Sequence, residues 1–289
     1  MLYVFLSVCC SVIVSVLLKL ARRYGIDIFQ AITWNYSMAI ALTWFFFKPA
    51  IGSFIFRHAP LGVFIAVGVL LPLVFWVLAS SVRVVGIVRT DVAQRLSLFI
   101  PIVASFLLFN EVLSPLKIAG IIVGFAAILC SIPWQKKTAN RKVLSNAWLY
   151  LVIVFFGFGA IDILFKKVAT FTAVPYTTSL FFIYALSFVI AFIGLFVRVV
   201  AGQTRIVWPH IVFGLVLGVA NFGNILFYLK AHKALATSPS AVFSAMNIGV
   251  ITLGAIVGLF VFNERLSLLN KIGIGLAIIA IIIITYSQF

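Results

Sequence analysis

Acidic side chains are so rare in this chain that each of them is a candidate for chemistry. The 289 residues include five carboxylates, namely Asp27, Asp91, Glu111, Asp162 and Glu264. Asp162 precedes Lys166 by four positions, so the two side chains share one face of a helix. They form either an ion pair near a helix end or a site for a proton or a substrate ammonium group. For Glu111 and Glu264 we expect a structural role, because each falls in a short turn where it can cap or pair with the next helix.

Gln94, Arg95 and Asn247 are the second group of residues that could do chemistry. Gln94 and Asn247 occupy equivalent positions in an internal repeat described below, so the two amides could face each other across the seam of that repeat. The Arg95 guanidinium can bind a carboxylate or a phosphate with two hydrogen bonds. We therefore predict that all three contact a small-molecule substrate. The alternative is that Asp91 and Arg95, four positions apart, pair with each other and cap their helix.

Four further residues are weaker candidates. Asn224 shares a helix face with Asn221, and a hydrogen bond between helices explains such an amide as well as substrate contact does. Trp76 lies deeper in its apolar segment than tryptophans at segment edges, although aromatics make up 15% of the chain and most serve packing. Pro101 and Gly254 occupy equivalent mid-helix positions, and we predict that they act as hinges.

None of these residues forms an enzyme-like constellation. The three cysteines lie in apolar segments without metal-ligand spacing, and His58, His210 and His232 lie near different loops. A glycine-rich phosphate-binding motif is absent, so ATP is not the driver of any activity. We expect no enzyme, no metal and no cofactor.

The segments that must position these residues are overwhelmingly apolar. The chain is 65% hydrophobic and 9% charged, whereas soluble domains carry roughly 25% charged residues. Its apolar blocks have the length of about 20 residues that crosses a hydrocarbon core. Blocks such as 272–285 are apolar on every side, which excludes the alternating strands of a barrel. The sequence therefore predicts an all-α membrane protein. Because Lys and Arg gather at block ends, facing water and headgroups, the net charge of +16 does not indicate nucleic acid.

Charged, Pro and Gly clusters divide the chain into ten predicted transmembrane helices. The first five cover about 2–20, 28–47, 60–82, 88–109 and 115–133. The basic stretch 135–146 links them to five more, over about 147–167, 176–197, 208–229, 239–262 and 268–287. We interpret the start of the chain as the first helix, because it lacks the basic region and the cleavage site of a signal peptide.

An internal repeat relates the two halves. The segment F-N-E-V-L-S at 109–114 returns as F-N-E-R-L-S at 262–267, an offset of 153. Ten of the twenty positions from 109 to 128 are identical at this offset. Because five helices per repeat is an odd number, the second copy enters the membrane from the opposite side. We predict two inverted five-helix repeats, 1–134 and 147–289, with a substrate site near the midplane where they meet.

With ten helices and an N-E-x-L-S turn before the last helix of each half, the chain resembles the drug/metabolite transporter superfamily, EamA type. Phe75–Ala79, 110–122 and Ser11–Lys19 are similar to segments of the small multidrug resistance proteins of that superfamily. The resemblance implies transport of amino acids, sugars, nucleotide sugars, cations or other metabolites, often coupled to protons or to exchange. Those small proteins carry a proton-binding glutamate eight residues before the lysine that corresponds to Lys19. Here Ser11 stands at that position, so their coupling chemistry is not implied.

The leading functional hypothesis is a secondary transporter that exports a small metabolite, an amino acid or similar, by alternating access. In it, Asp162 and Lys166 would provide the coupling. Two alternatives stay open: a flippase or exchanger of phosphorylated or lipid-linked substrates, which Arg95 would suit, and a helical scaffold that transports nothing.

We expect a multi-pass protein of the inner (plasma) membrane, present as a monomer or homodimer, with the lipid bilayer and a small molecule as its partners. Two thirds of the Lys and Arg residues lie on the side of the central linker, which favours both termini outside. The resemblance instead implies both termini in the cytoplasm. The orientation is therefore open between these two.

Overall fold

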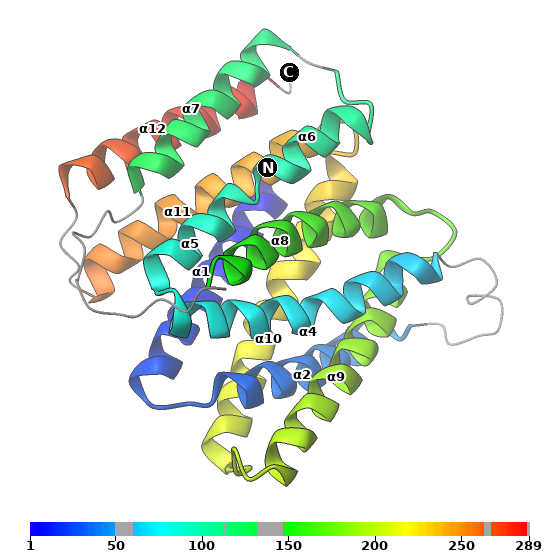
Figure 1. The fold of residues 1–289 in the computed structure, drawn as a ribbon. Coiled ribbons are helices and arrows are strands. Elements are labelled where there is room, and N and C mark those ends of the chain that lie inside the picture. The colour runs from blue at the N-terminus through cyan, green and yellow to red at the C-terminus, as the bar shows by residue number, and fades with distance from the viewer. Residues whose placement is uncertain (50–59, 113, 132–146, 263–266, 288–289) are drawn as a thin grey trace.

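The computed structural model describes residues 1–289 except 50–59, 113, 132–146, 263–266 and 288–289. Every regular element within the described residues is a helix (Figure 1). The helices are α1 (Leu2–Arg23), α2 (Ile28–Phe47), α4 (Leu61–Val84), α5 (Ile87–Leu96), α6 (Phe99–Leu107), α7 (Pro115–Ser131), α8 (Ala147–Thr170), α9 (Tyr176–Val200), α10 (Trp208–Ala234), α11 (Pro239–Phe262) and α12 (Leu268–Tyr286). The predicted linker over 135–146 lies outside the described residues.

Seven of these helices are long and apolar enough to cross a membrane: α1, α4, α8, α9, α10, α11 and α12. Two shorter apolar segments cover Val92–Leu107 and Pro115–Cys130. Large apolar side chains such as Phe45 and Phe260 are about three-quarters exposed, which only a hydrocarbon solvent makes favourable in such numbers. The chain is thus a multi-pass membrane protein, and the all-α prediction is confirmed. Ten crossings stay a prediction.

The prediction of one continuous helix over 88–109 is wrong. The helix is interrupted at Ser97 and Leu98, which separate α5 from α6. Pro101 has no backbone N–H, so it cannot donate to the carbonyl of Ser97 four residues earlier. That carbonyl accepts instead from the N–H of Ile100, at 3.0 Å, in a tighter turn. The break therefore lies where the proline puts it, one turn before Pro101.

Helices from the two halves of the chain pack in antiparallel pairs. Along α7 and α12, Gly120 lies against Ile284 while Gly124, one turn later, lies against Ala280. The two helices run side by side at one edge of the molecule (Figure 1). Glycine at both α7 positions lets the backbones approach closely, as in other membrane helix pairs.

The second antiparallel pair is α2 with α9. The Thr33 hydroxyl donates to the carbonyl of Ala191 at 3.3 Å, whereas Trp44 stacks near Phe181 at 5.6 Å between ring centroids. Residue numbers thus rise along α2 as they fall along α9. This pair lies at the edge of the molecule opposite α7 and α12 (Figure 1).

Both chain termini lie at the same end of the bundle, which we call the terminal face. A pocket of about 280 Å³ between α1, α11 and α12 is lined by Met1 and Phe5 together with Ile281 and Thr285. Ser7 contacts Asn224 and Tyr3 contacts Lys230, so α10 runs antiparallel to α1 and ends at the terminal face. α8 also ends there, because Lys166 bonds to the last turn of α10, and α11 begins shortly after α10 ends. A contact of the Lys233 ammonium with the Tyr176 ring, 5.4 Å from its centre, joins the end of α10 to the start of α9 at this face.

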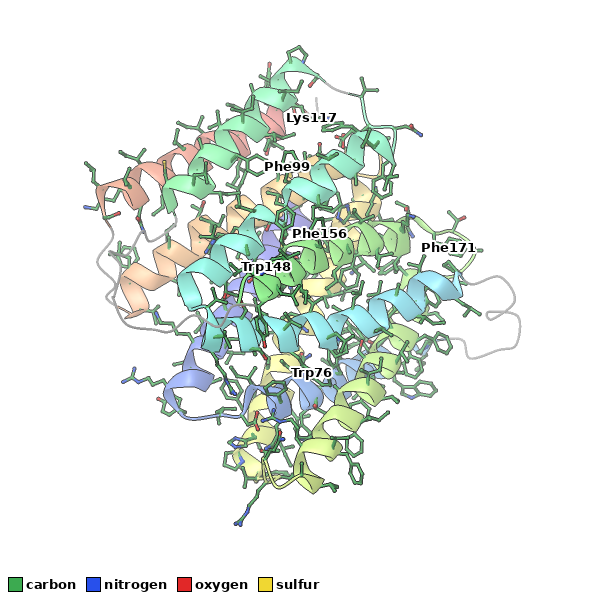
Figure 2. All side chains as sticks on the ribbon, in the orientation of Figure 1. Trp76, Phe99, Lys117, Trp148, Phe156 and Phe171 are labelled. Carbon is green, nitrogen blue, oxygen red and sulfur yellow. The ribbon has the colours of Figure 1, made fainter. Side chains whose placement is uncertain are left out.

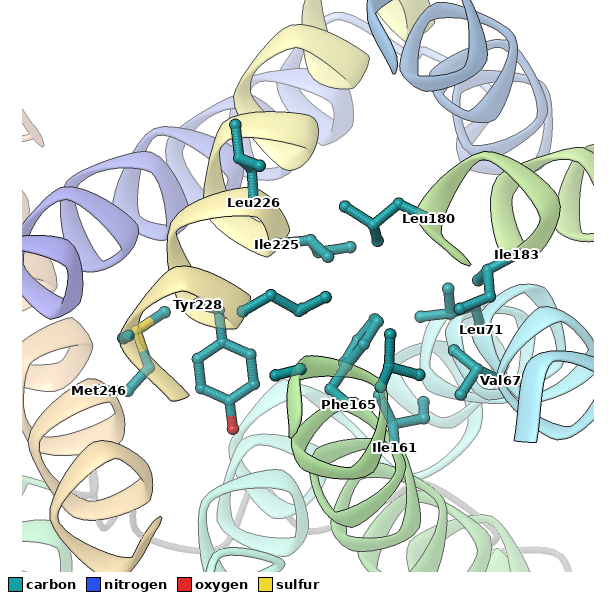
Figure 3. Close-up of a cluster of buried hydrophobic side chains, with 14 of the residues drawn as sticks. Val67, Leu71, Ile161, Phe165, Leu180, Ile183, Ile225, Leu226, Tyr228 and Met246 are labelled. Carbon is teal, nitrogen blue, oxygen red and sulfur yellow. The ribbon is translucent and has the colours of Figure 1, made fainter. Parts of the chain in front are cut away.

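The core is a continuous apolar cluster that joins α8, α10, α4 and α9. In Figure 3, Phe165 and Ile161 of α8 meet Leu180, Ile183 and Ile225 of the neighbouring helices. Tyr228 lies at the edge of this cluster, and its hydroxyl points away from the labelled aliphatic side chains. The apolar core thus ends where the polar groups described next begin.

Candidate functional site

A polar ladder joins α8 to α10 close to the terminal face. Asp162 and Lys166 are four residues apart on α8, and Tyr228 and His232 are four residues apart on α10, so each pair shares one helix face. The Tyr228 hydroxyl donates to Asp162 Oδ1 at 2.9 Å, which makes the deeper rung. Lys166 Nζ lies 3.4 Å from the backbone oxygen of His232, which makes the rung nearer the face.

The ion pair predicted between Asp162 and Lys166 does not form within the described residues. Lys166 is only 1% exposed and donates to the carbonyl of Ala236 at 2.9 Å in addition to that of His232. These carbonyls belong to the C-terminal end of α10, where helix dipoles favour a cation. Asp162 instead accepts a hydrogen bond from the Tyr228 hydroxyl. Lys166 is thus held in place by α10, and Asp162, half-buried, has no cationic partner among the described residues.

His232 is fully buried between two aromatic rings. Its ring centroid lies 4.6 Å from that of Tyr228 and 4.6 Å from that of Phe243 on α11. Neither ring nitrogen has a hydrogen-bond partner among the described residues. A buried polar group without a hydrogen-bond partner costs about 1–3 kcal/mol, so the buried imidazole of His232 lowers the stability of the folded protein. A buried polar group without a partner requires an explanation, and a functional role is one such explanation.

Glu111 ties the first half of the chain to the second. It accepts from Lys117 Nζ at 2.8 Å, which confirms the predicted pairing with the first turn of the next helix. It also accepts from the backbone N–H of Ser240 at 2.8 Å and from the Ser240 hydroxyl at 2.6 Å. Sequence reasoning missed this second contact. Asn110 adopts the left-handed conformation, with φ of 51°, a region that asparagine tolerates better than most residues. The corresponding Glu264 lies outside the described residues.

We call the following seven residues the terminal-face cluster: Glu111, Lys117, Asp162, Lys166, Tyr228, His232 and Ser240. With both lysines and both carboxylates ionised, their formal charges cancel. Figure 2 labels Lys117 near the start of α7. The aromatic ring of Phe109, whose centre is 5.9 Å from Lys166 Nζ, covers the group from the segment after α6.

Asn247 lies at the same depth as Asp162. Counted at 1.5 Å per residue from the ends of α11 and α8, both lie about 12 Å from the terminal face. Asn247 Nδ2 donates to the carbonyl of Phe243 at 3.0 Å, one turn nearer the face. The hydroxyl of Ser244 on the same helix is buried without a partner among the described residues. Asn247 therefore remains a candidate, at the same depth as Asp162.

Gln94 and Arg95 lie at the end of α5, both half-buried. The carbonyl of Gln94 accepts from the Ser97 hydroxyl at 2.6 Å in the turn between α5 and α6. No hydrogen bond joins Gln94 to Asn247 in the described part of the chain, and the facing of the two amides stays a prediction. The backbone break places Arg95 where α5 gives way to α6. The side chain of Asp91, its predicted alternative partner, is outside the described residues.

Asn224 and Trp76 are engaged in packing between helices. Asn224 Oδ1 accepts from the Ser7 hydroxyl of α1 at 2.9 Å, which is the interhelical bond that was the alternative to substrate contact. Trp76 lies on the side of α4 that faces α9 and fills the space left by Gly194 (Figure 2). Its ring centroid is 6.0 Å from that of Phe29 on α2. Neither residue joins the terminal-face cluster.

The two predicted hinges differ. Pro101 accounts for the break between α5 and α6, whereas α11 runs unbroken through Gly254. A Cβ added at Gly254 would meet nothing within 4 Å, so this glycine is not required by packing.

A relative in sequence and a solved structure each match this chain over nearly its whole length. An uncharacterized protein of Haemophilus influenzae (strain ATCC 51907 / DSM 11121 / KW20 / Rd) is 44% identical over 288 residues, which span 97% of this chain and 96% of that protein. The chain belongs to the family of that protein. No protein-family model matches it.

A crystal structure of another protein is similar to this family member with a TM-score of 0.75, over 99% of this chain and 96% of that one. The sequences are 12% identical, so the likeness shows the shared fold alone. What the family member does must therefore be argued from its own residues. Those residues offer a half-buried carboxylate with a tyrosine donor, a buried histidine and an amide at the same depth.

Proposed function

We propose that the protein is a secondary transporter of the drug/metabolite transporter superfamily, EamA type. In this proposal it moves a small metabolite, an amino acid or similar, out across the inner membrane by alternating access between two inverted five-helix repeats. One observation carries the proposal: helices at equivalent places in the two halves pack against each other in antiparallel pairs.

Antiparallel pairing is the arrangement expected of inverted repeats. The offset of 153 makes α7 equivalent to α12, and their order in the halves makes α2 equivalent to α9. Both pairs are antiparallel, as argued above from Gly120 with Ile284 and from Thr33 with Ala191. A rotation of half a turn about an axis in the membrane plane exchanges two such helices. Transporters built on this plan alternate between two openings by rocking one repeat against the other.

Contacts between helices that are not equivalent support the same two-fold relation, which exchanges α2 with α9 and α4 with α10. On α10, Gly214 and Gly218 lie against Trp34 and Met38 of α2, so these helices run parallel. The two-fold relation turns the pair α10 with α2 into the pair α4 with α9. In that pair Gly68 of α4 lies against Leu186 of α9, and Trp76 of α4, eight residues later, lies against Gly194 of α9. The helices α4 and α9 therefore also run parallel. A helical scaffold has no need for such correspondence.

The substrate would lie between Asp162 and the α5–α6 break. Asp162 accepts from one tyrosine hydroxyl and faces no cation among the described residues, so it can receive a substrate ammonium group or a proton. Arg95 could receive a substrate carboxylate. These two charges of opposite sign suit an amino acid better than a sugar. Gln94 and Asn247 would add amide contacts, and Lys166 would keep α10 against α8.

Transport by purified protein in proteoliposomes tests the proposal. A thermal-shift screen against amino acids, amines, sugars, nucleotides and phosphorylated sugars first names the ligand, because binding raises stability by RT ln(1 + [L]/Kd). Uptake of the labelled hit is then expected to fall at least tenfold in the Arg95→Leu and Asn247→Leu variants, with normal expression and folding. Ile256→Leu on α11, at the apolar pocket, serves as the matched control. A protein that transports none of these compounds, or variants that transport as the wild type does, would overturn the proposal.

A further inference from the structure

We propose that His232 is a proton-relay residue, which connects Asp162 to water at the terminal face and thereby makes transport proton-coupled. The inference rests on the proposed function. It goes beyond that function by naming the driving ion and the route by which the ion arrives. Three observations carry it: the position of His232, the state of its nitrogens and the groups around it.

His232 lies between Asp162 and the water at the terminal face. The histidine is two residues before the end of α10 at Ala234, which is about 3 Å along the helix axis. Lys233 and Ala236, which follow it, are exposed. One turn deeper on the same face, Tyr228 donates its hydroxyl hydrogen to Asp162. The order from water inward is thus His232, Tyr228, Asp162.

The nitrogens of His232 are free to take part in proton transfer. A neutral imidazole carries one N–H donor and one acceptor nitrogen, so it can take a proton at one nitrogen and release another from the opposite one. In a purely structural histidine at least one nitrogen is bonded, because leaving both unmet is costly. Here both nitrogens lack partners among the described residues, while Tyr228 and Phe243 hold the ring on two sides.

Every element around His232 contributes a polar or charged group. α8 contributes Asp162 and Lys166, and α10 itself contributes Tyr228. The segment after α6 contributes Glu111, with Lys117 of α7 bonded to it. α11 contributes Ser240 and the hydroxyl of Ser244, which has no partner within the described part of the chain. Lys166 and Glu111 are committed to their own hydrogen bonds, so Asp162 is the carboxylate to which a proton can travel.

The transfer balances with solvent water as the only co-reactant. Hydronium at the terminal face gives a proton to one imidazole nitrogen. The opposite nitrogen releases its proton, through a bridging water, to the Tyr228 oxygen. Tyr228 at the same time passes its own hydroxyl proton to the Asp162 carboxylate. One proton has entered, one rests on Asp162, and Tyr228 and His232 are neutral again, with the imidazole in its other tautomer.

The first test follows protonation of Asp162 and needs no substrate. In proteoliposomes, a laser-triggered pH jump is followed by the carboxyl C=O infrared band that Asp162→Asn removes. The His232→Phe variant keeps the aromatic packing but has no nitrogen, so the band is expected to respond at least tenfold more slowly. In His232→Ala, added imidazole should restore the rate, which a merely structural role would not produce. His210→Phe, the same change at the other end of α10, should respond as the wild type.

The second test follows transport. Proton-driven accumulation of the labelled hit should fall at least tenfold in His232→Phe, while exchange at equal pH on both sides falls less. Equal infrared rates in His232→Phe and the wild type, or no band lost in Asp162→Asn, would overturn the relay. Absence of any transport in the wild type overturns the proposed function, while the infrared rates still decide the relay.

Discussion

At the scale of single residues, the molecule uses its few charges in ways that spacing alone does not reveal. Lys166 and Asp162 are placed to pair along α8, yet each bonds to α10. The open end of α10 offers carbonyl oxygens that need donors, and a lysine chain can reach them. Asp162 accepts its hydrogen bond from the neutral hydroxyl of Tyr228. A carboxylate in this setting is where a proton or an ammonium group should bind.

The first prediction concerns the pH dependence of transport. In the Asp162→Asn variant the amide cannot take up a proton, so we expect transport measured over a range of pH values to lose its dependence on pH. Tyr228→Phe retains the carboxylate and removes both its donor and the last step of the proposed relay, so its pH profile should move along the pH axis without becoming flat, at a lower transport rate. An Asp162→Asn profile that follows the wild type would reduce Asp162 to a structural partner of Tyr228.

The second prediction concerns Glu111, which is buried with Lys117 at the terminal face. Glu111→Ala leaves the Lys117 ammonium without its carboxylate, and breaking one side of a buried pair typically costs about 3–5 kcal/mol. Replacing both residues, as Glu111→Ala with Lys117→Met, should cost less than Glu111→Ala alone, because no charge is then left unpaired. Unfolding by titration with SDS measures both. Equal losses would mean that the contacts of Glu111 with Ser240 matter more than its ion pair.

At the scale of helices, glycines decide how closely elements approach. A Cβ on Gly218 of α10 would lie 2.7 Å from the backbone oxygen of Asn35 and 2.6 Å from Met38 Cβ, so α2 would have to move away. A Cβ on Gly254 of α11 would meet nothing within 4 Å. Both glycines are within helices, so alanine brings both the same gain in helix propensity.

The third prediction uses this matched pair. Gly218→Ala should lower the melting temperature in detergent, at a cost of about 1–3 kcal/mol from overpacking, whereas Gly254→Ala should leave it unchanged or raise it. Gly254→Ala also tests the predicted hinge, because a needed hinge would show as slower transport at unaltered stability. Equal melting temperatures for the two variants would contradict the close approach of α2 and α10.

The break between α5 and α6 is the other feature of this scale. The proline that causes it is visible in the sequence, but its consequence was read as a hinge within one helix. Since Ser97 must find another donor for its carbonyl, the helix tightens by one turn there, and Gln94 and Arg95 lie directly before the interruption. Asn247, equivalent by sequence to Gln94, stays within an unbroken helix. The two halves are therefore not equal where the proposed substrate binds.

At the scale of the whole molecule, the terminal face unites both chain ends with the terminal-face cluster. Met1 and Thr285 line one pocket, so the N- and C-termini must lie on one side of the membrane. The fourth prediction is that reporters fused to the two ends give the same result in a topology assay. The count of Lys and Arg predicts that this side faces outside the cell, whereas the family resemblance predicts the cytoplasm. A C-terminal reporter that reads cytoplasmic would contradict the count but not the shared side.

Much of the fold could be predicted because lipid restricts the choices. A chain with such long apolar blocks must satisfy its backbone within helices, so the all-α class and the approximate bounds of most helices follow from composition. The turn containing Glu111 and its bond to Lys117 could also be predicted, because both lie within seven residues. The contacts of Asp162 could not, since they depend on which of several helices lies next to α8.

By itself, the sequence determined that the protein is a helical membrane protein with a repeated turn motif and which polar residues lie within its helices. Only the tertiary structure decided which of those residues meet. His232 lies near a loop of its own in the sequence, yet Lys166 of α8 and Phe243 of α11 enclose it. Pro101 interrupts the helix that carries Gln94, whereas the helix that carries Asn247 is unbroken. The physical reason is that spacing along a helix fixes a face, whereas hydrogen bonds across helices depend on neighbours that are distant in the chain.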